Sequence, residues 1–598
     1  SSLNFELPRE WLAEGELHVQ LDRLEVEGTQ STLPCDGCDN LFPSGTPALK
    51  TFREVPPVRI WLVSVPYTAT PGAAPTVPSQ FDISMLASWL RRAYPTAEVR
   101  DTQMLFATQD DDPEERDDDG NITQEGFTCS DINAEVRDVV AGLTGQHVSQ
   151  RYYGLVANGG GFMRGCAPIG GHFGSGPTGP AGGWDTDSSF GDWYGGHELG
   201  HTYDRKHPGQ CDETADDDAY PYDAIGLIGN AQFDNQGLDA GNTALSVPMD
   251  LYDWRNNWAD VMTYCDRQWI SDYTYKGILK DLCAEDPGSC PDRAQITRRA
   301  RRAKRKKGPA VTVSGELDLA NDRLDLGTVA TGRGLTLTER PKRSDYEIVL
   351  RGSGRDRSFP FEPKEIADLP AGQERAEVHE VVPFDSATRK IEIEKNGQAL
   401  ETVRVSRNAP SVRVAKPKRK GDELKVRWRS RDRDGGRRTH SVFYSADGKE
   451  YLPVASGLRG NSYTLDLSEL PGGKDARVRV VANDGVLTGA GTSKAVKVPV
   501  KPPTVSILSP QAGTAYDADD QIQLIASVED LQDDEIPAKR IVWRSDRQGE
   551  LGTGPQILTR LDAGTHQITA TARNSGRKSG SASIRLDVAE VPPLFDAS

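Results

Sequence analysis

A run of basic residues at 298–307, RRARRAKRKK, divides this sequence into two chemically different parts. Residues 1–295 hold 47 Asp and Glu against 19 Lys and Arg, a net charge of −28, whereas the remaining 42 acidic and 52 basic residues give +10. A like-charged run without apolar periodicity is typical of a solvated linker. A chain of 598 residues is too long for a single hydrophobic core. The sequence therefore predicts several domains, joined by a basic linker that we place at 296–310.

The part before the linker has the pattern of an α/β domain. Buried strands are indicated at 58–65 and 151–157, and helical spacing at 82–94 and 133–143. Strands that alternate with helices favour an α/β domain, which we place at 56–295. Residues 1–55 alternate apolar and polar side chains, as strands do, but are too few to fold alone.

The part after the linker has an all-β pattern. Short alternating strands are separated by turn signals, and Asn396-Gly397 marks a two-residue hairpin. Three segments have the length of a β-sandwich: 311–407, 408–500 and 501–598. VRWRSRDRDGG and RVRVVANDG in the second resemble fibronectin type III-like bacterial modules, and PPTVSILSP and IVWRSDRQGELGTG in the third resemble immunoglobulin-like modules of secreted bacterial enzymes. The expected fold class is multidomain, an α/β domain followed by all-β sandwich modules.

All eight cysteines precede the linker. An even number of cysteines in one module is typical of a disulfide framework in an oxidising compartment, although reduced buried thiols in a cytosolic enzyme are the alternative. No apolar run approaches the ~18 residues that span a bilayer. The chain begins without Met or a leader, as a processed chain would. We expect a secreted monomer with no membrane span.

One window carries residues suited to metal chemistry, GGHELGHTYDRKHPGQC at 195–211. His197 and His201 are four residues apart, so on a helix they share one face and can place two imidazole nitrogens on one Zn²⁺. Glu198 lies beside them, where a carboxylate can take a proton from a water that attacks a carbonyl. His207 reaches the same metal only if the helix ends near residue 203 and the chain turns sharply.

Downstream, DVMTYC at 260–265 places a Met two residues before a Tyr. Together with the three histidines, this resembles the metzincins, zinc endopeptidases defined by HExxHxxGxxH and a Met-containing turn. The resemblance covers roughly 56–295 and implies an α/β metzincin-like catalytic domain. It implies that His197, His201 and His207 are zinc ligands and that Glu198 is the general base. Met262 would form the apolar floor beneath the imidazoles. Tyr264 would supply a phenol that ligates zinc at rest and stabilises the oxyanion during turnover.

Asp204 stands where the family has a glycine at the turn. A left-handed turn costs most side chains roughly 1–2 kcal/mol, but Asp tolerates it better, so we expect the zinc site to survive. The missing glycine leaves the particular metzincin family unassigned. No cysteine-switch motif is visible, so latency through a thiolate ligand is unsupported, with Cys35 and Cys38 left as the alternative for such a role.

Several segments near this window have two interpretations. Residues 162–179 combine glycines with extended residues, which suits either a substrate peptide pairing with an exposed edge or a plain loop. His172 within it is expected to be an isolated surface histidine rather than a fourth metal ligand or a specificity residue. The acidic segments 110–119 and 216–218 could bind Ca²⁺, but they lack EF-hand spacing, so solvated loops are preferred and Ca²⁺ is the alternative.

Two cysteine pairs are expected. Cys211 and Cys265 both flank the expected metal site, and a bond between them would tie the third ligand to the Met-turn. Cys283 and Cys290 are paired by proximity alone. The partners of the remaining cysteines stay open: Cys35, Cys38, Cys129 and Cys166.

The sequence thus predicts a secreted zinc metalloendopeptidase that hydrolyses peptide bonds of proteins or glycoproteins through a metal-activated water. The alternative is a surface-binding or adhesive protein with an inactive protease-like domain. Loss of Glu198 or of a histidine would mark that alternative, and none is lost. Nucleic acid is not expected as a partner, because no aromatic residues accompany the basic run. The modules after residue 310 are expected to contribute no residue to the zinc site.

Overall fold

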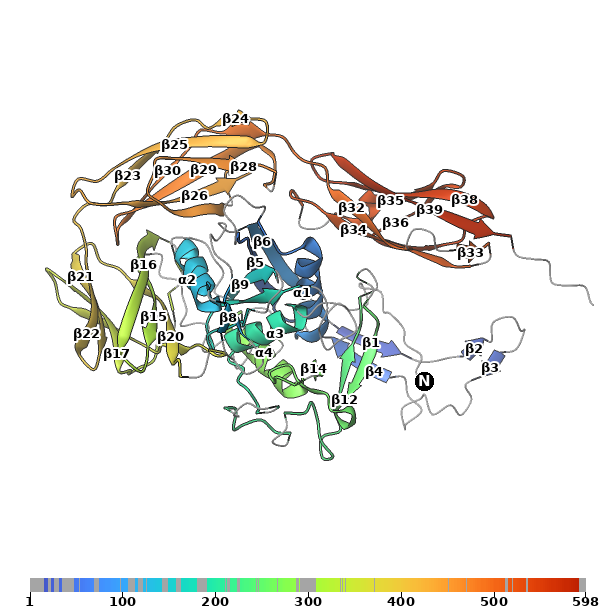
Figure 1. Cartoon of the computed structure of the whole chain (residues 1–598), viewed down its shortest axis with the longest axis horizontal. Helices are drawn as coiled ribbons and strands as arrows, with labels where there is room; N and C mark the ends of the chain where they lie inside the picture. Colours follow the sequence, from blue (N-terminus) through green and yellow to red (C-terminus); the bar gives the residue numbers. More distant parts are fainter. Residues whose placement is uncertain are drawn as a thin grey trace, which may run out of the picture.

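The computed structural model describes residues 15–19, 23–25, 32–34, 48–52, 54–286, 290 and 308–590. Gaps within these ranges are 69–74, 97, 106–112, 117–121, 125, 142–148, 158–162, 180–190, 210, 212–215, 223–225, 243–244, 246, 266, 334, 336, 339, 370–371, 450, 469, 511–514, 519 and 534–535. The basic run, Cys35, Cys38 and most of the acidic segment 110–119 therefore lie outside the described residues. Strands predominate over helices in the described part (Figure 1). Among the described residues, no helix is both long and apolar enough to cross a membrane.

A four-stranded parallel sheet organises residues 54–290, called here the parallel-sheet domain. Its strand order is β10-β9-β5-β6, with bounds Phe173–Thr178, Gln150–Ala157, Val58–Val65 and Val99–Leu105. Both faces are covered: Ile60 and Leu62 of β5 belong to one hydrophobic cluster, whereas Trp61 and Val63 belong to another. A continuous apolar strand is the pattern that burial on both faces requires.

Helices cover the two faces of this sheet. They are α1 (Gln80–Ala93), α2 (Cys129–Val140), α3 (Gly191–Thr202) and α4 (Asp272–Glu285). α1, α3 and α4 contribute to the cluster on the Ile60 face, and α2 to the cluster on the Trp61 face. α2 starts four residues before the expected helix because Thr128 and Asp131 form a capping box at its N-terminus.

Short antiparallel pairs complete the first part of the chain. Near the N-terminus they are β1 (Gly15–Val19) with β4 (Ala48–Phe52) and β2 (Arg23–Glu25) with β3 (Thr32–Pro34). Farther on they are β7 (Glu115–Arg116) with β8 (Ile122–Gln124) and β11 (Gln236–Asp239) with β12 (Asp250–Asp253). A 3₁₀ helix, η3 (Trp254–Asn256), precedes the parallel pair β13 (Ala259–Asp260) and β14 (Gln268–Trp269).

The first β-module consists of two four-stranded sheets. One has the order β16-β15-β20-β19, with bounds Arg323–Arg333, Pro309–Asp318, Arg375–Pro383 and Lys364–Glu365. The other has the order β18-β17-β21-β22, with bounds Arg357–Phe361, Tyr346–Gly352, Thr388–Lys395 and Gln398–Arg404. The hairpin prediction at Asn396-Gly397 is confirmed: both residues have positive φ, 51° and 80°, between β21 and β22.

Two further β-modules follow, each with its own hydrophobic cluster. The second contains β23 (Ser411–Val414), β24 (Lys418–Lys420), β25 (Glu423–Arg431), β26 (Thr439–Ser445), β27 (Leu452–Leu458), β28 (Ser462–Asp466), β29 (Gly473–Asn483), β30 (Thr488–Thr492) and β31 (Val496–Val498). The third contains β32 (Thr504–Ser509), β33 (Ala515–Asp517), β34 (Ile522–Glu529), a 3₁₀ helix η5 (Ala538–Arg540), β35 (Ile541–Ser545), β36 (Gly549–Thr553), β37 (Gln556–Thr559), β38 (Gly564–Arg573) and β39 (Ser579–Ala589).

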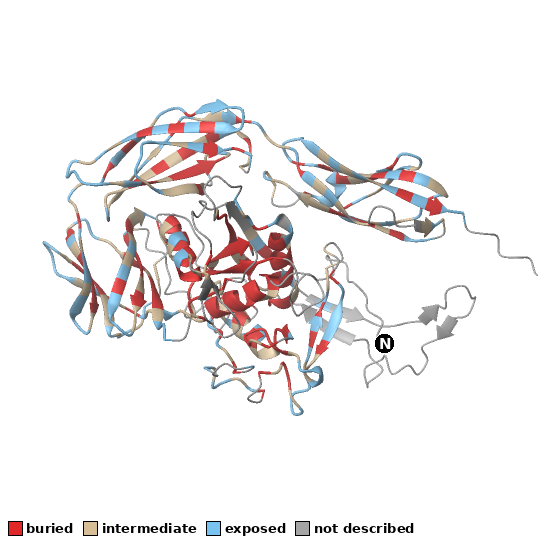
Figure 2. Cartoon of the chain, in the orientation of Figure 1, coloured by how far each residue is buried: buried red, intermediate tan, exposed pale blue. Residues whose placement is uncertain are grey.

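The first β-module docks onto the parallel-sheet domain through α2, which lies beside β15 and β16 (Figure 1). Ser130 donates to Glu316 at 2.7 Å, and the Thr328 amide donates to Asp138 at 2.8 Å. Most of the parallel sheet and its helices are buried (Figure 2). The module is therefore in direct contact with the domain that carries the histidine motif.

Candidate metal centre

Helix α3 carries the first two histidines of the motif and is packed closely against its surroundings. His197 and His201 are 3% and 0% exposed. A Cβ at Gly200 would lie 2.4 Å from Sδ of Met262, so the glycine permits the close approach of the Met-containing turn to the helix. The two imidazoles lie on one face of the helix, with ring centroids 4.9 Å apart.

The chain turns sharply after α3, as the motif requires. The helix ends at Thr202, and Asp204 has φ +59°, the left-handed conformation expected at this position. The Asp204 amide donates to the His201 carbonyl at 2.9 Å. This turn brings His207 back to the helix, where its Nε2 lies 3.3 Å from Nε2 of His197.

Backbone carbonyls fix the protonation of the two helical imidazoles. Nδ1 of His197 donates to the Val261 carbonyl at 2.7 Å, and Nδ1 of His201 donates to the Arg205 carbonyl at 2.8 Å. Because a carbonyl can only accept, Nδ1 carries the proton in each ring and Nε2 keeps a lone pair. Burial also lowers the pKa of His201 to about 4, although Asp368 opposes the shift.

These lone pairs converge. Nε2 of His201 and Nε2 of His207 lie 3.2 and 3.3 Å from Nε2 of His197. Ligand atoms ~2.1 Å from one tetrahedral centre are about 3.4 Å apart, so this separation fits a single tetrahedrally coordinated metal ion. Without a cation, buried nitrogen lone pairs would repel one another at this distance. The donor set thus could hold a metal ion.

A fourth donor, absent from the sequence prediction, completes the group. Asp368 of the first β-module places Oδ2 3.0 Å from Nε2 of His201 and 3.3 Å from Nε2 of His197, and Oδ1 3.3 Å from Nε2 of His207. The side chain of Asp368 is 1% exposed. The expectation that the modules contribute no residue to this site is therefore wrong, because docking of the first module brings Asp368 to the histidines.

Glu198 lies next to the histidines and is fully buried. Both of its carboxylate oxygens lack a well-formed hydrogen bond among the described residues. Burial raises its pKa well above the usual range, and the Asp368 carboxylate raises it further, whereas Arg164 and the Tyr194 hydroxyl oppose the shift. A Cβ at Gly165 would lie 2.5 Å from Oε1 of Glu198, so that glycine makes room for the carboxylate.

The Met-containing turn lies against the same group. Met262 is fully buried, and the Tyr264 hydroxyl lies 3.4 Å from Nε2 of His207. Asp260, which the sequence analysis did not single out, organises the turn by accepting from the amides of Met262 and Ser271, each at 2.9 Å. The position of this acidic residue, two residues before the Met, was the sequence feature that could have pointed to its role in the turn.

Carboxylates of the acidic segment 216–218 accept hydrogen bonds from neighbouring residues. Asp216 accepts from the His207 amide at 2.6 Å, and its own amide donates to the His207 carbonyl at 3.1 Å. Asp217 accepts from the Tyr273 hydroxyl at 3.0 Å. The contacts of Asp216 position the third histidine, a role that the sequence did not suggest.

Three cysteine pairs lie at disulfide distance in the described residues. Cys211–Cys265 and Cys283–Cys290, the two expected pairs, have Cα atoms 5.3 and 5.7 Å apart. The third pair, Cys129–Cys166, joins α2 to the segment before β10, and its Cα atoms are 5.7 Å apart. Three such pairs fit an extracellular protein.

His172 is placed outside the donor group. Its Nδ1 lies 2.9 Å from Nη1 of Arg151. Burial and the neighbouring Arg151 lower its pKa well below the usual range, so the ring is neutral and accepts this bond. His172 is therefore not a member of the donor group, but it pairs with Arg151 and is not the isolated surface histidine that was expected.

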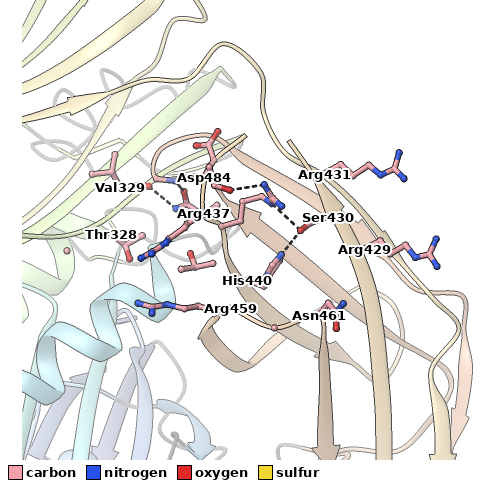
Figure 3. Close-up of a pocket in the computed structure, with 17 residues that line it drawn as sticks. Thr328, Val329, Arg429, Ser430, Arg431, Arg437, His440, Arg459, Asn461 and Asp484 are labelled. Atoms are coloured by element: carbon pink, nitrogen blue, oxygen red, sulfur yellow. Dashed lines mark hydrogen bonds between the residues drawn. The ribbon is translucent and has the colours of Figure 1, made fainter. Parts of the chain in front are cut away.

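A separate cavity of about 1070 Å³ lies between the first and second β-modules (Figure 3). Its lining includes Arg437, Arg459 and His440, the last of which contacts Ser430 at 2.8 Å. Arg429 and Arg431 also line it but extend away from its centre (Figure 3). The Ser430–His440 contact lacks an orienting carboxylate, because Nδ1 of His440 donates to the Leu458 carbonyl at 3.0 Å, and the histidine group remains the candidate site.

No family model matches the sequence, and no curated protein matches it. Similar solved structures are modules of fibronectin type III-like or immunoglobulin-like kind. Fibronectin(III)-like modules of Clostridium thermocellum CbhA are 12% identical, with 32% of this chain and 95% of that chain covered and a TM-score of 0.15. A chimeric titin tandem is 14% identical, with 30% and 98% covered and a TM-score of 0.12. The chicken interferon gamma receptor alpha chain is 11% identical, with 30% and 97% covered and a TM-score of 0.16.

Proposed function

We propose that this chain is a secreted zinc metalloendopeptidase of the metzincin type, with its catalytic domain at 56–295 and protein or glycoprotein substrates. The observation that carries the proposal is the convergence of three imidazole Nε2 atoms, with the Nδ1 protons of His197 and His201 bound by backbone carbonyls. His197, His201 and His207 would hold the ion. When bound, zinc supplies a Lewis acid that polarises a peptide carbonyl and activates water.

The residues around the histidines have the roles that peptide hydrolysis needs. Glu198 is buried beside the ligands with neither oxygen in a well-formed hydrogen bond, and the charge of a bound cation would favour its ionised form, which would take a proton from the attacking water and pass it to the leaving amine. Tyr264 places its hydroxyl at the edge of the group, where it would donate to the developing oxyanion. Residues 165–169 run alongside as an extended segment that would pair with a substrate backbone.

The alternative of an inactive binding protein has one feature in its favour, because Asp368 covers the histidines. A degenerate site would be expected to lose some of its catalytic residues, however. Here all three histidines, the glutamate and the tyrosine are retained and oriented together. A functional site that Asp368 covers explains both the position of Asp368 and the retention of the catalytic residues.

Zinc stoichiometry and peptide cleavage test the proposal. Because Asp368 covers the site, the assays use the full-length chain both with Asp368 and with Asp368→Ala. His201→Ala is expected to lose zinc and cleavage, while Glu198→Gln keeps zinc and loses about 10²- to 10⁴-fold in rate. His440→Ala, which removes a buried histidine of the second module, is the control that keeps both. Near-normal cleavage by Glu198→Gln would refute the general-base role.

A further inference from the structure

The residue that covers the histidines is delivered by a short extended segment of the first β-module, residues 364–368, called here the inserted segment. On one side it belongs to the module's own sheet: Lys364 and Glu365 pair with β20, and the Ile366 amide donates to the Arg375 carbonyl at 2.9 Å. Its other side faces the parallel-sheet domain. The inserted segment is thus a strand between two folded units.

Its pairing with the parallel-sheet domain is antiparallel and regular. The Ile169 amide donates to the Glu365 carbonyl at 2.8 Å, and the Ala367 amide donates to the Ala167 carbonyl at 2.9 Å. Pro168 and Ile366 form the bridge between these two bonds. Backbone pairing at a sheet edge is the mode by which extended peptides are bound.

The segment with which the inserted segment pairs is also paired on its opposite edge. Cys166 pairs antiparallel with Ser175 of β10 through two backbone bonds of 3.0 and 3.2 Å. The Cys129–Cys166 pair ties this strand to α2. With β10 on one side and the inserted segment on the other, residues 166–169 have both edges filled. A substrate strand could pair there only after the inserted segment leaves.

Asp368, at the end of the inserted segment, is held in an unusual conformation. Its φ is +65°, the left-handed region that costs most side chains about 1–2 kcal/mol and that Asp tolerates better than most. Its carboxylate is buried against three nitrogens, two of which carry no proton on the facing atom. A cation between the carboxylate and the imidazoles would stabilise this buried arrangement.

The inserted segment is anchored by the docking of its whole module. Arg137 of α2 lies 3.5 Å from Glu377 of β20, and both side chains are at most 3% exposed. Ile366 and Leu369 pack against the hydrophobic cluster that covers the Trp61 face of the parallel sheet. The position of Asp368 therefore depends on an interface, so separation of the module would withdraw the carboxylate and the paired strand together.

We propose that the inserted segment is an internal inhibitor of this site. Asp368 is a fourth ligand of the metal, and residues 365–367 occupy the backbone position of a substrate strand. The inhibitor is supplied by a domain that follows the site in the sequence. This inference rests on the proposed function for its consequence, because only a peptidase would be inhibited in this way.

Access to the metal tests the inference independently of peptide cleavage. The full-length chain is loaded with Co²⁺, and acetohydroxamate, a small bidentate ligand, is titrated while the visible absorption of the cobalt is recorded. The proteins are wild type, Asp368→Asn, Asp368→Ala and the control Asp356→Ala, an exposed carboxylate of the same module. Asp368→Asn keeps the shape of the side chain, so it guards against loss of folding in the alanine variant.

Both Asp368 variants are expected to bind acetohydroxamate at least about 10-fold more tightly than wild type. In the variants, acetohydroxamate no longer competes with the Asp368 carboxylate for the metal. The Asp356→Ala control is expected to match wild type. Equal affinity in all four proteins would overturn the assignment of Asp368 as ligand and cover. If the Asp368 variants bind acetohydroxamate tightly but cleave no peptide, the ligand assignment stands and the peptidase proposal fails.

Discussion

Glu377 lies at the interface that holds the inserted segment, and its protonation is expected to control how tightly the first β-module docks. It is 2% exposed and faces Arg137 from α2, while Lys364 is its neighbour on β19 and Glu316 approaches from β15. Burial raises its pKa to about 7, an effect that Arg137 and Lys364 only partly oppose and that Glu316 reinforces. When the module separates, the carboxylate is expected to return to its ordinary pKa near 4.3.

The sign and the size of the effect follow from proton linkage. Between the two pKa values the docked state binds more protons at Glu377 than the separated state, so the contribution of Glu377 to docking is strongest at low pH and weakens as the pH rises through about 7. Each pH unit in this range changes the docking free energy by at most about 1.4 kcal/mol. From pH 5 to pH 7 the contribution of Glu377 to docking should therefore fall by up to about 2.7 kcal/mol, or about 100-fold in the docking equilibrium, whereas His379 on the same strand, whose pKa burial lowers to about 3, contributes with the opposite sign.

Hydrogen exchange measures this equilibrium at the interface itself. The amides of Ile169 and Ala367 donate across it, so their protection reports separation of the inserted segment. After correction for intrinsic exchange, protection in wild type is expected to fall with pH relative to protection in Glu377→Gln. Asp356→Asn, an exposed carboxylate of the same module, should follow wild type. Identical pH profiles for wild type and Glu377→Gln would refute the assignment of the proton to Glu377.

Two further predictions concern the packing around the histidines. Gly165→Ala would place a Cβ 2.5 Å from Oε1 of Glu198 and 2.9 Å from the Ser175 carbonyl. This variant should keep zinc and lose at least about 10-fold in the rate of peptide cleavage. Gly354→Ala is the control, because a Cβ there would meet no atom within 4 Å. Replacing both Cys211 and Cys265 by Ser removes a disulfide with a sequence separation of 54 and should lower the unfolding free energy by about 4 kcal/mol. The same replacement of Cys283 and Cys290, with a separation of 7, should lower it by about 2.5 kcal/mol. Equal shifts in the denaturant midpoints of the two variants would contradict the loop-entropy reasoning.

The sequence was informative wherever the site depends on local geometry. His197 and His201 share a helical face because they are four residues apart, and the left-handed conformation of Asp204 follows from the need to return His207 to that face. These relations extend over about ten residues and are set by helix geometry. The strands at 58–65 and 151–157 were also predictable, because burial on both faces leaves a continuous apolar run.

The parts that could not be predicted depend on contacts between distant segments. The Cys129–Cys166 pair joins a helix to a strand edge, and neither segment contains a pattern that names the other. Glycines of the segment 162–179 suggested an open edge, whereas the structure fills that edge with residues 365–367. Asp368 follows an ordinary two-residue strand and has no neighbouring histidine or carboxylate motif.

The charge distribution shows why docking was not foreseeable from composition. The acidic first part and the basic remainder attract one another at long range, which favours association without selecting a surface. Some charges at the observed interface are reversed: Arg137 comes from the acidic part, while Glu377 and Asp368 come from the basic part. Net charge promotes the encounter, but these few inverted contacts select the docked arrangement. Since exposed charges are screened by salt far more than buried pairs, added salt should slow association more than it loosens the docked state.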